Sequence, residues 1–173
     1  MGYTTEFYGE VTVDPPLNDA EVAYLVKFNE SRRMKRGKGP YFVEGTGYMG
    51  QDEDADVEEY NYPPDGQPGL WCHWRPSSDG TKIAWDGGEK FYFAAEWMEY
   101  IIGHFLKQAA PDATRQFNRD AEAAGNPFDG FTFDHMVNGV IEAQGEEPDD
   151  KWRLVVEDNE VRVTRAQVVW PDA

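Results

Sequence analysis

The segment GLWCHWRPSSDGTKIAWDGGEKFYFAAEWMEYIIGHFL, residues 69–106, decides the fold expected for this chain. It holds four of the six tryptophans of the sequence. Two short apolar runs, 70–75 and 82–85, flank the turn-forming sequence SSDG, and this arrangement predicts a β-hairpin. Apolar side chains then recur at helical spacing over 90–107, which predicts a helix. We therefore expect the hairpin and the helix to form the centre of the hydrophobic core.

The helix predicted over 90–107 has two apolar faces. The first is a regular core-facing arc, made of Phe91, Ala94, Ala95, Met98, Ile101, Ile102 and Phe105. The second is an aromatic stripe, made of Phe93, Trp97, Tyr100 and His104. A helix with so wide an apolar surface is either covered on two sides by its own chain or presents one side to a partner. The aromatic stripe is therefore a candidate partner-binding site, and coverage by the rest of the chain is the alternative.

Strand-like alternation in the flanking sequence predicts an antiparallel sheet. Residues 5–13 alternate between apolar and polar side chains, which is typical of a strand with one buried face. Asp158-Asn159 predicts the turn of a second hairpin over 152–156 and 161–164. Shorter strands are expected at 40–44, 131–133 and 140–144, and an edge strand at 167–171.

Helix signals complete the expected architecture. Asn18 with Glu21 three residues later forms a capping box, which predicts a helix over 19–33. A peripheral helix is expected over 111–124. We expect an α+β fold in a single domain over 1–173, with a mainly antiparallel sheet packed against two principal helices and a peripheral insertion at 108–130.

The charge of the chain limits its partners. The formal net charge is −17, and residues 39–173 carry all of the excess, with ten basic and 27 acidic side chains. Such a field disfavours direct binding to nucleic acid or to an anionic membrane and favours a basic protein partner. The single cysteine excludes an internal disulfide, and no apolar run is long enough to span a membrane. We expect a protein of the cytoplasm.

Two charged runs carry candidate motifs. The basic run SRRMKRGKG, 31–39, is interpreted as cations that complement the end of the preceding helix. The acidic run 51–60 fails as a calcium loop, because Val57 and Pro63 stand where glycine and glutamate are required. The preceding GxGxxG at 45–50 lacks the apolar helix of a dinucleotide site. A nucleic-acid mimic remains as a hypothesis, with carboxylates in the place of phosphates at Asp52, Asp54, Asp56, Glu58 and Glu59.

A ligand cleft is the alternative candidate site. Its proposed lining consists of Trp71, His73, Trp85, Trp97 and His104. No metal site is expected, because Cys72 and His73 point to opposite faces of a strand and only three histidines are present. No serine, histidine and acid grouping has informative spacing, so no catalytic residue and no cofactor are expected.

Several longer segments carry a resemblance to a protein family. They are GYTTEFYGEVTVDPPLNDAEVAYLVKFNESRRM at 2–34, GPYFVEGTGYMGQ at 39–51, PPDGQPGLWCHW at 63–74, WDGGEKFY at 85–92, EWMEYIIGHFL at 96–106 and NGVIEAQGEEPDDKWRLVVEDNEV at 138–161. On these segments the chain resembles a family of small acidic proteins from actinobacteria and their bacteriophages. The resemblance covers most of the chain except 108–130. It implies a phage or actinobacterial setting, and it implies no activity or catalytic residue.

Three functional hypotheses follow from the sequence. The leading one is a non-enzymatic, acidic interaction protein, such as a phage or host-defence accessory factor, that binds a protein partner. The second is a small-ligand-binding protein or an enzyme that uses the aromatic and histidine cleft. The third is a structural component of a phage particle.

Overall fold

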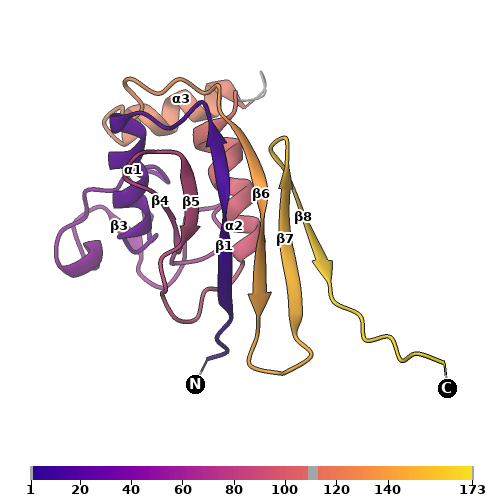
Figure 1. The fold of residues 1–173 in the computed structure, drawn as a ribbon. Coiled ribbons are helices and arrows are strands. Elements are labelled where there is room, and N and C mark those ends of the chain that lie inside the picture. Colours follow the sequence, from indigo (N-terminus) through magenta and orange to yellow (C-terminus); the bar gives the residue numbers. More distant parts are fainter. Residues whose placement is uncertain (1, 109–112, 173) are drawn as a thin grey trace.

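A six-stranded antiparallel sheet is the main element of this α+β fold. The computed structural model describes residues 2–108 and 113–172. The strands are β1 (Glu6–Asp14), β2 (Lys35–Arg36), β3 (Val57–Glu59), β4 (Trp74–Pro76), β5 (Lys82–Trp85), β6 (Met136–Gln144), β7 (Lys151–Glu157) and β8 (Glu160–Arg165). Six of them form the main sheet in the order β4-β5-β1-β6-β7-β8, with antiparallel neighbours (Figure 1). β2 and β3 form a separate two-stranded sheet.

β1 organises the sheet, because it pairs with β5 on one side and with β6 on the other. Its inward side chains Phe7, Val11 and Val13 are buried, whereas the residues between them are exposed, as the alternation of the sequence predicts. The pairing with β6 is unbroken along all of β1. Gly139 lies opposite Val11, and a Cβ at Gly139 would lie 2.8 Å from the Val11 Cα. The register at this point therefore requires glycine.

Helices cover one face of the sheet. They are α1 (Asp19–Asn29), α2 (Ala94–Ile101) and α3 (Thr114–Ala123), and α2 continues into a π-helical turn at Ile102–Leu106. Figure 1 shows α2 behind the sheet and α1 beside β4. Phe28 of α1 joins the two helices, since its ring centroid lies 5.8 Å from that of Trp97 and 5.1 Å from that of Phe105. All three side chains are fully buried, so the core lies between the sheet and these helices.

Several local predictions are confirmed. The Asn18 and Glu21 side chains form both hydrogen bonds of the capping box at the start of α1. β7 and β8 form the predicted hairpin, and its turn residues Asp158 and Asn159 have φ values of 48° and 71°. These angles are those of a type I′ turn, which matches the twist of the paired strands.

The helix predicted over 19–33 ends at Asn29 instead. The Asn29 side-chain amide donates hydrogen bonds to the carbonyl oxygens of Cys72 and Trp74, at 3.0 and 3.3 Å. The backbone N–H of Arg33 donates to the Leu70 carbonyl oxygen at 2.8 Å. These bonds hold the chain after Asn29 against residues 70–74, in β4 and just before it, where the prediction assumed a continuing helix.

The strands predicted at 40–44 and 131–133 are also wrong. The carbonyl oxygens of Pro40 and Phe42 accept hydrogen bonds from the Arg33 guanidinium instead of pairing with a strand. Phe133 has a left-handed φ of 49°, which interrupts extended backbone. The edge strand expected at 167–171 does not form either, and this segment is irregular.

The described residues contain three α-helices, where two principal helices were predicted. α2 begins later than residue 90, because Lys90 and Phe93 have left-handed φ values of 58° and 60°. The helix predicted over 111–124 is observed from Thr114, and residues 111 and 112 lie outside the described ranges. Within the predicted insertion, the ring of Phe117 packs against Tyr41, with the ring centroids 5.3 Å apart.

Candidate functional site

An apolar groove is the candidate functional site. It has a volume of about 610 Å³ and lies between the loops that precede β4 and α2, together with Met49. Its lining consists of Met49, Pro63, Pro68, Gly69, Leu70, Trp71, His73, Glu89, Lys90, Tyr92 and Phe93. Such a volume and such an apolar lining are typical of binding pockets.

Exposed side chains form the rim of this groove. Met49, Tyr92 and Phe93 are 42%, 48% and 56% exposed, although each is large and apolar or aromatic. Glu89 and Lys90 contribute one charge of each sign. The groove therefore presents a cluster of the residue types that are enriched at protein interfaces.

Strained backbone supports three of the groove residues. Met49, Lys90 and Phe93 have left-handed φ values of 53°, 58° and 60°. Side chains of this size disfavour that region by about 1–2 kcal/mol each. Of the other described non-glycine residues with positive φ, all except Phe133 are asparagine or aspartate, which tolerate it. Strain of this kind concentrates at binding and catalytic sites, so its convergence on one groove indicates a function there.

A polar atom without a partner lies behind the groove. Trp97 is fully buried, and its indole Nε1 has no hydrogen-bond partner among the described residues. A Cβ placed on Gly69 would lie 3.7 Å from this nitrogen and 3.5 Å from the Phe93 ring. Gly69 and Phe93 both line the groove. The unpaired N–H therefore lies next to the groove wall, separated from it by the glycine backbone and the Phe93 ring.

Most of the predicted aromatic stripe is covered by the chain itself. Trp97 and Tyr100 are buried, with exposures of 0% and 7%, and His104 is half-buried. The Tyr100 ring stacks on Phe28, with the centroids 6.2 Å apart. Phe93 alone of the four stripe residues is exposed, and it lines the groove. The structure therefore does not bring the stripe together as one surface.

His104 lies in a different environment, within the π-helical turn. Its ring stacks on Tyr100 at 3.9 Å between centroids, and its Nδ1 lies 2.7 Å from the Tyr41 hydroxyl. Burial lowers the pKa of His104 to about 4 and raises that of Tyr41 well above its ordinary value. At neutral pH the Tyr41 hydroxyl therefore donates to an uncharged imidazole.

The five residues of the predicted cleft do not share one cavity. Trp71 and His73 line the groove, whereas His104 lines a second cavity of about 630 Å³ that includes Glu99 and Asp120. Trp85 packs against Phe7, with the ring centroids 5.6 Å apart. Trp97 is buried behind Gly69, as described above. The two histidines therefore cannot act on one ligand.

His73 is held at the groove by a carboxylate. Its Nδ1 lies 3.0 Å from an oxygen of Asp86, which also accepts hydrogen bonds from the Asn29 amide and the Gly88 N–H. Burial works to raise the pKa of Asp86, but the hydrogen bonds from His73, Gly88 and Asn29 outweigh it and hold the pKa below its ordinary value. This pairing fixes the orientation of the His73 ring at the groove wall.

The acidic residues proposed for nucleic-acid mimicry are not equivalent. Asp54 and Asp56 bind the Arg36 guanidinium at 3.2 and 3.0 Å, and the Arg36 side chain is almost fully buried. Asp52, Glu58 and Glu59 are exposed. Two of the five carboxylates therefore fold the loop, and three remain available at the surface.

Two arginines of the basic run 31–39, Arg33 and Arg36, lie in the folded interior rather than complementing the end of α1. Arg33 is 2% exposed, stacks on the Phe28 ring at 4.3 Å and donates to the backbone carbonyls of residues 40 and 42. Arg32 lies over the Tyr60 ring at 4.3 Å. With Arg36 bound to its two aspartates, these arginines fix the loops from which the groove is built.

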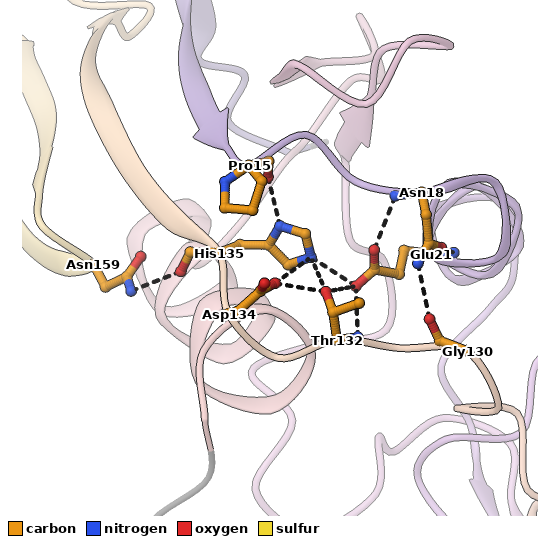
Figure 2. A network of polar contacts seen from close by, with 8 residues as sticks. All are labelled: Pro15, Asn18, Glu21, Gly130, Thr132, Asp134, His135 and Asn159. Carbon is orange, nitrogen blue, oxygen red and sulfur yellow. Dashed lines mark hydrogen bonds and ion pairs between the residues drawn. The ribbon is translucent and has the colours of Figure 1, made fainter.

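A buried polar network joins distant segments at one end of the sheet (Figure 2). The His135 ring lies between Pro15 and Glu21, with its Nδ1 2.6 Å from the Pro15 carbonyl oxygen and its Nε2 2.7 Å from the Glu21 carboxylate. Both side chains are almost fully buried. The Asn159 side chain, at the β7–β8 turn, donates to the His135 carbonyl oxygen at 3.0 Å.

This network does not have the geometry of a catalytic triad. The hydroxyl of Thr132 and the carboxylate of Glu21 both approach the same ring nitrogen, Nε2, at 3.1 and 2.7 Å. A relay needs the acid on one nitrogen and the hydroxyl on the other. In this protein the second nitrogen is bound by a backbone carbonyl oxygen, so the network fixes α1, β1 and β6 relative to one another.

Metal and thiol chemistry have little support in the described residues. In residues 2–108 and 113–172, no three His, Cys, Asp or Glu side chains are placed to hold a metal ion. Burial raises the pKa of the Cys72 thiol to about 12, so it is protonated at neutral pH. No helix in these ranges has the length and apolarity needed to cross a membrane.

Sequence reasoning missed several groove residues. Tyr92 and Lys90 carry no motif, Met49 lies within the GxGxxG at 45–50 that lacks the features of a dinucleotide site, and the turn-rich segment NYPPDGQPG at 61–69 carries no site prediction. The signal that could have found them is the density of prolines, glycines and aromatics on both sides of the hairpin.

Comparisons with known proteins add no assignment. No protein-family model, curated protein or solved structure matches the chain. The resemblance to actinobacterial and phage proteins stays a prediction.

Proposed function

We propose that this chain is a non-enzymatic binding protein, and that the apolar groove holds a segment of a protein partner. The observation that carries this proposal is the convergence of three strained residues, Met49, Lys90 and Phe93, on an apolar groove with an exposed aromatic rim. Strained backbone conformations persist only where the surrounding structure holds them, and they concentrate at functional sites. The side chains that line a binding site must also be fixed in position.

The chemistry of the groove and the charge of the chain describe the partner. An apolar or aromatic side chain fits the groove, because its walls are prolines, aromatics and aliphatic residues. Basic residues beside that side chain match a molecule with a net charge of −17. The expected occupant is therefore an extended segment with a large apolar side chain next to arginine or lysine.

The setting of this function is part of the proposal. A phage or host-defence accessory role agrees with the sequence resemblance, and a cytoplasmic location agrees with the unpaired cysteine. Nucleic-acid mimicry has weaker support, because Arg36 binds two of its five proposed carboxylates.

A peptide-display selection against the folded protein tests the proposal. We expect enriched peptides that combine an aromatic residue with lysine or arginine. We expect Gly69→Leu to abolish their binding, because the added side chain starts in contact with the Phe93 ring and Trp97 and displaces the groove wall. Tyr8→Ala is the matched control, since Tyr8 is exposed to 55%, as Phe93 is to 56%, but lies on the outer face of the sheet. Enriched peptides that bind Gly69→Leu as well as the wild type, or no enrichment at all, would overturn the proposal.

A further inference from the structure

The segment after β8, residues 166–172, is an exposed apolar segment. Val168, Val169 and Trp170 are 73%, 81% and 85% exposed. Figure 1 shows that this segment leaves the sheet at the end of β8 and runs away from the body of the molecule. An isolated exposed apolar residue is ordinary, but three in succession on an extended segment form a ready docking element.

The backbone of this segment is free to bind. The Ala166 N–H donates to the Lys151 carbonyl oxygen at 2.9 Å. Beyond it, residues 167–172 make no hydrogen bond, ion pair or ring contact with the other described residues. Their N–H and carbonyl groups can therefore pair with another surface at little cost.

The segment has the chemistry expected of the groove's occupant. Trp170 is a large aromatic side chain, and it is preceded by two valines. Arg162 and Arg165 precede the segment on β8, and each pairs with a carboxylate of its own chain, Glu157 at 3.7 Å and Asp150 at 3.4 Å. The match to the groove therefore rests on the apolar side chains of the segment, which suit the apolar lining.

We propose that the groove of one copy of this chain holds residues 168–170 of a second copy. This inference rests on the proposed function, because it names an occupant for the same groove. The direction of the segment in Figure 1, away from its own body, favours a second copy over its own groove. Trp170 then occupies the apolar groove beside Tyr92 and Phe93.

Reciprocal exchange of the segment between two copies closes the assembly as a dimer. Each molecule carries a charge of −17, so the two copies repel each other over their whole surfaces. Added salt screens this repulsion and leaves the apolar contact. We therefore expect self-association to strengthen as the salt concentration rises, which is the opposite of the salt dependence expected for a basic partner.

A complementation experiment with full-length variants tests the inference. Mass is measured by light scattering during gel filtration, at rising protein concentration and at low and high salt. We expect the wild type to approach twice its monomer mass of 19.7 kDa, and we expect Trp170→Ala and Gly69→Leu each to remain monomeric alone. A mixture of the two variants restores a dimer, because one supplies an intact segment and the other an intact groove. Tyr8→Ala is the control and dimerises like the wild type.

Two results would overturn the inference. The first is a wild-type protein that stays monomeric at the highest concentration, which excludes the exchange. The second is a mixture of the two variants that stays monomeric, because the segment of one variant then does not bind the groove of the other. A synthetic peptide of residues 162–172, titrated into full-length Trp170→Ala, separates this failure from failure of the proposed function. If display-selected peptides bind and this peptide does not, the groove binds another partner. If neither binds, both proposals fail.

Discussion

Replacing Glu21 tests how strongly the buried network of Figure 2 holds the fold. The Glu21 carboxylate accepts from the His135 ring at 2.7 Å and from the Asn18 backbone N–H at 2.9 Å, and Glu21 is 0% exposed. Removing one partner of a buried charged pair costs about 3–5 kcal/mol. Loss of the capping box adds about 1 kcal/mol. The Thr132 hydroxyl, 3.1 Å from His135 Nε2, remains as a partner of the ring and offsets part of the loss, so we expect Glu21→Ala to lower the free energy of unfolding by about 3–5 kcal/mol.

Urea unfolding followed by circular dichroism measures this change, with an unchanged m value expected. Asp134→Asn is the matched control, because its carboxylate also approaches His135 Nε2, but at 3.8 Å and with 58% exposure. We expect the control to cost less than about 1 kcal/mol. Equal effects of the two substitutions, or a loss below about 1 kcal/mol for Glu21→Ala, would refute the assignment of the buried pair as a structural centre.

Three further predictions concern the groove and the loops around it. Phe93→Gly removes the strain of the left-handed backbone at residue 93. We therefore expect peptide binding to be lost while the free energy of unfolding in urea is unchanged or rises by up to about 1 kcal/mol. A loss of stability above about 1 kcal/mol would contradict this. Arg36→Met leaves Asp54 and Asp56 without their cation, and we expect a loss of about 2–4 kcal/mol in the same assay, with faster proteolysis of 51–60; an effect below about 0.5 kcal/mol would show that the loop folds without Arg36. The folded-state pKa of His104 is about 4, below its ordinary value of 6.5, so on acidification the unfolded chain takes up this proton before the folded protein does. The contribution of neutral His104 to the free energy of unfolding is therefore complete above pH 6.5 and is lost as the pH falls towards 4. The stability difference between wild type and His104→Gln, measured in urea at pH 7.5 and 4.5, should therefore shrink by on the order of 2 kcal/mol on acidification, and a constant difference would contradict it.

The parts of the fold that depend on local chemistry could be predicted from sequence. The alternation of β1, the capping box of α1 and the Asp158-Asn159 turn are each determined by residues a few positions apart. The overall α+β class follows from these elements, because an antiparallel sheet with one apolar face needs helices to cover it.

The errors come from long-range contacts. The sequence places Arg33 and Arg36 in a basic run that is typical of a surface, yet both are buried. Arg33 binds carbonyl oxygens 7 and 9 residues further along the chain, and Arg36 binds aspartates 18 and 20 residues further along. Helical periodicity places His104 on one stripe with Trp97, but left-handed residues delay the start of α2 and a π-helical turn alters its end. Residues 70–73 do not join the strand predicted over 70–75, because the strand pairs only from Trp74; Leu70, Trp71 and His73 line the groove instead.

The dependence on contacts outside the local sequence also explains how much of the candidate site could be predicted. The predicted aromatic stripe includes Phe93 and the predicted cleft includes Trp71 and His73, and all three line the groove. Their common location depends on left-handed backbone at Lys90 and Phe93, for which neither residue type gives a signal. The sequence could therefore supply members of the site but not its position.

Nuclear magnetic resonance of the tryptophan indole N–H signals tests the groove most directly. The signals are followed while a peptide with one aromatic residue flanked by arginines, taken from the display selection, is titrated into the protein. We expect the signals of Trp71, in the groove wall, and Trp97, behind Gly69, to shift with saturation, and that of Trp152, which does not line the groove, to stay in place. A saturable shift at Trp152 with none at Trp71 and Trp97 would contradict the groove as the binding site.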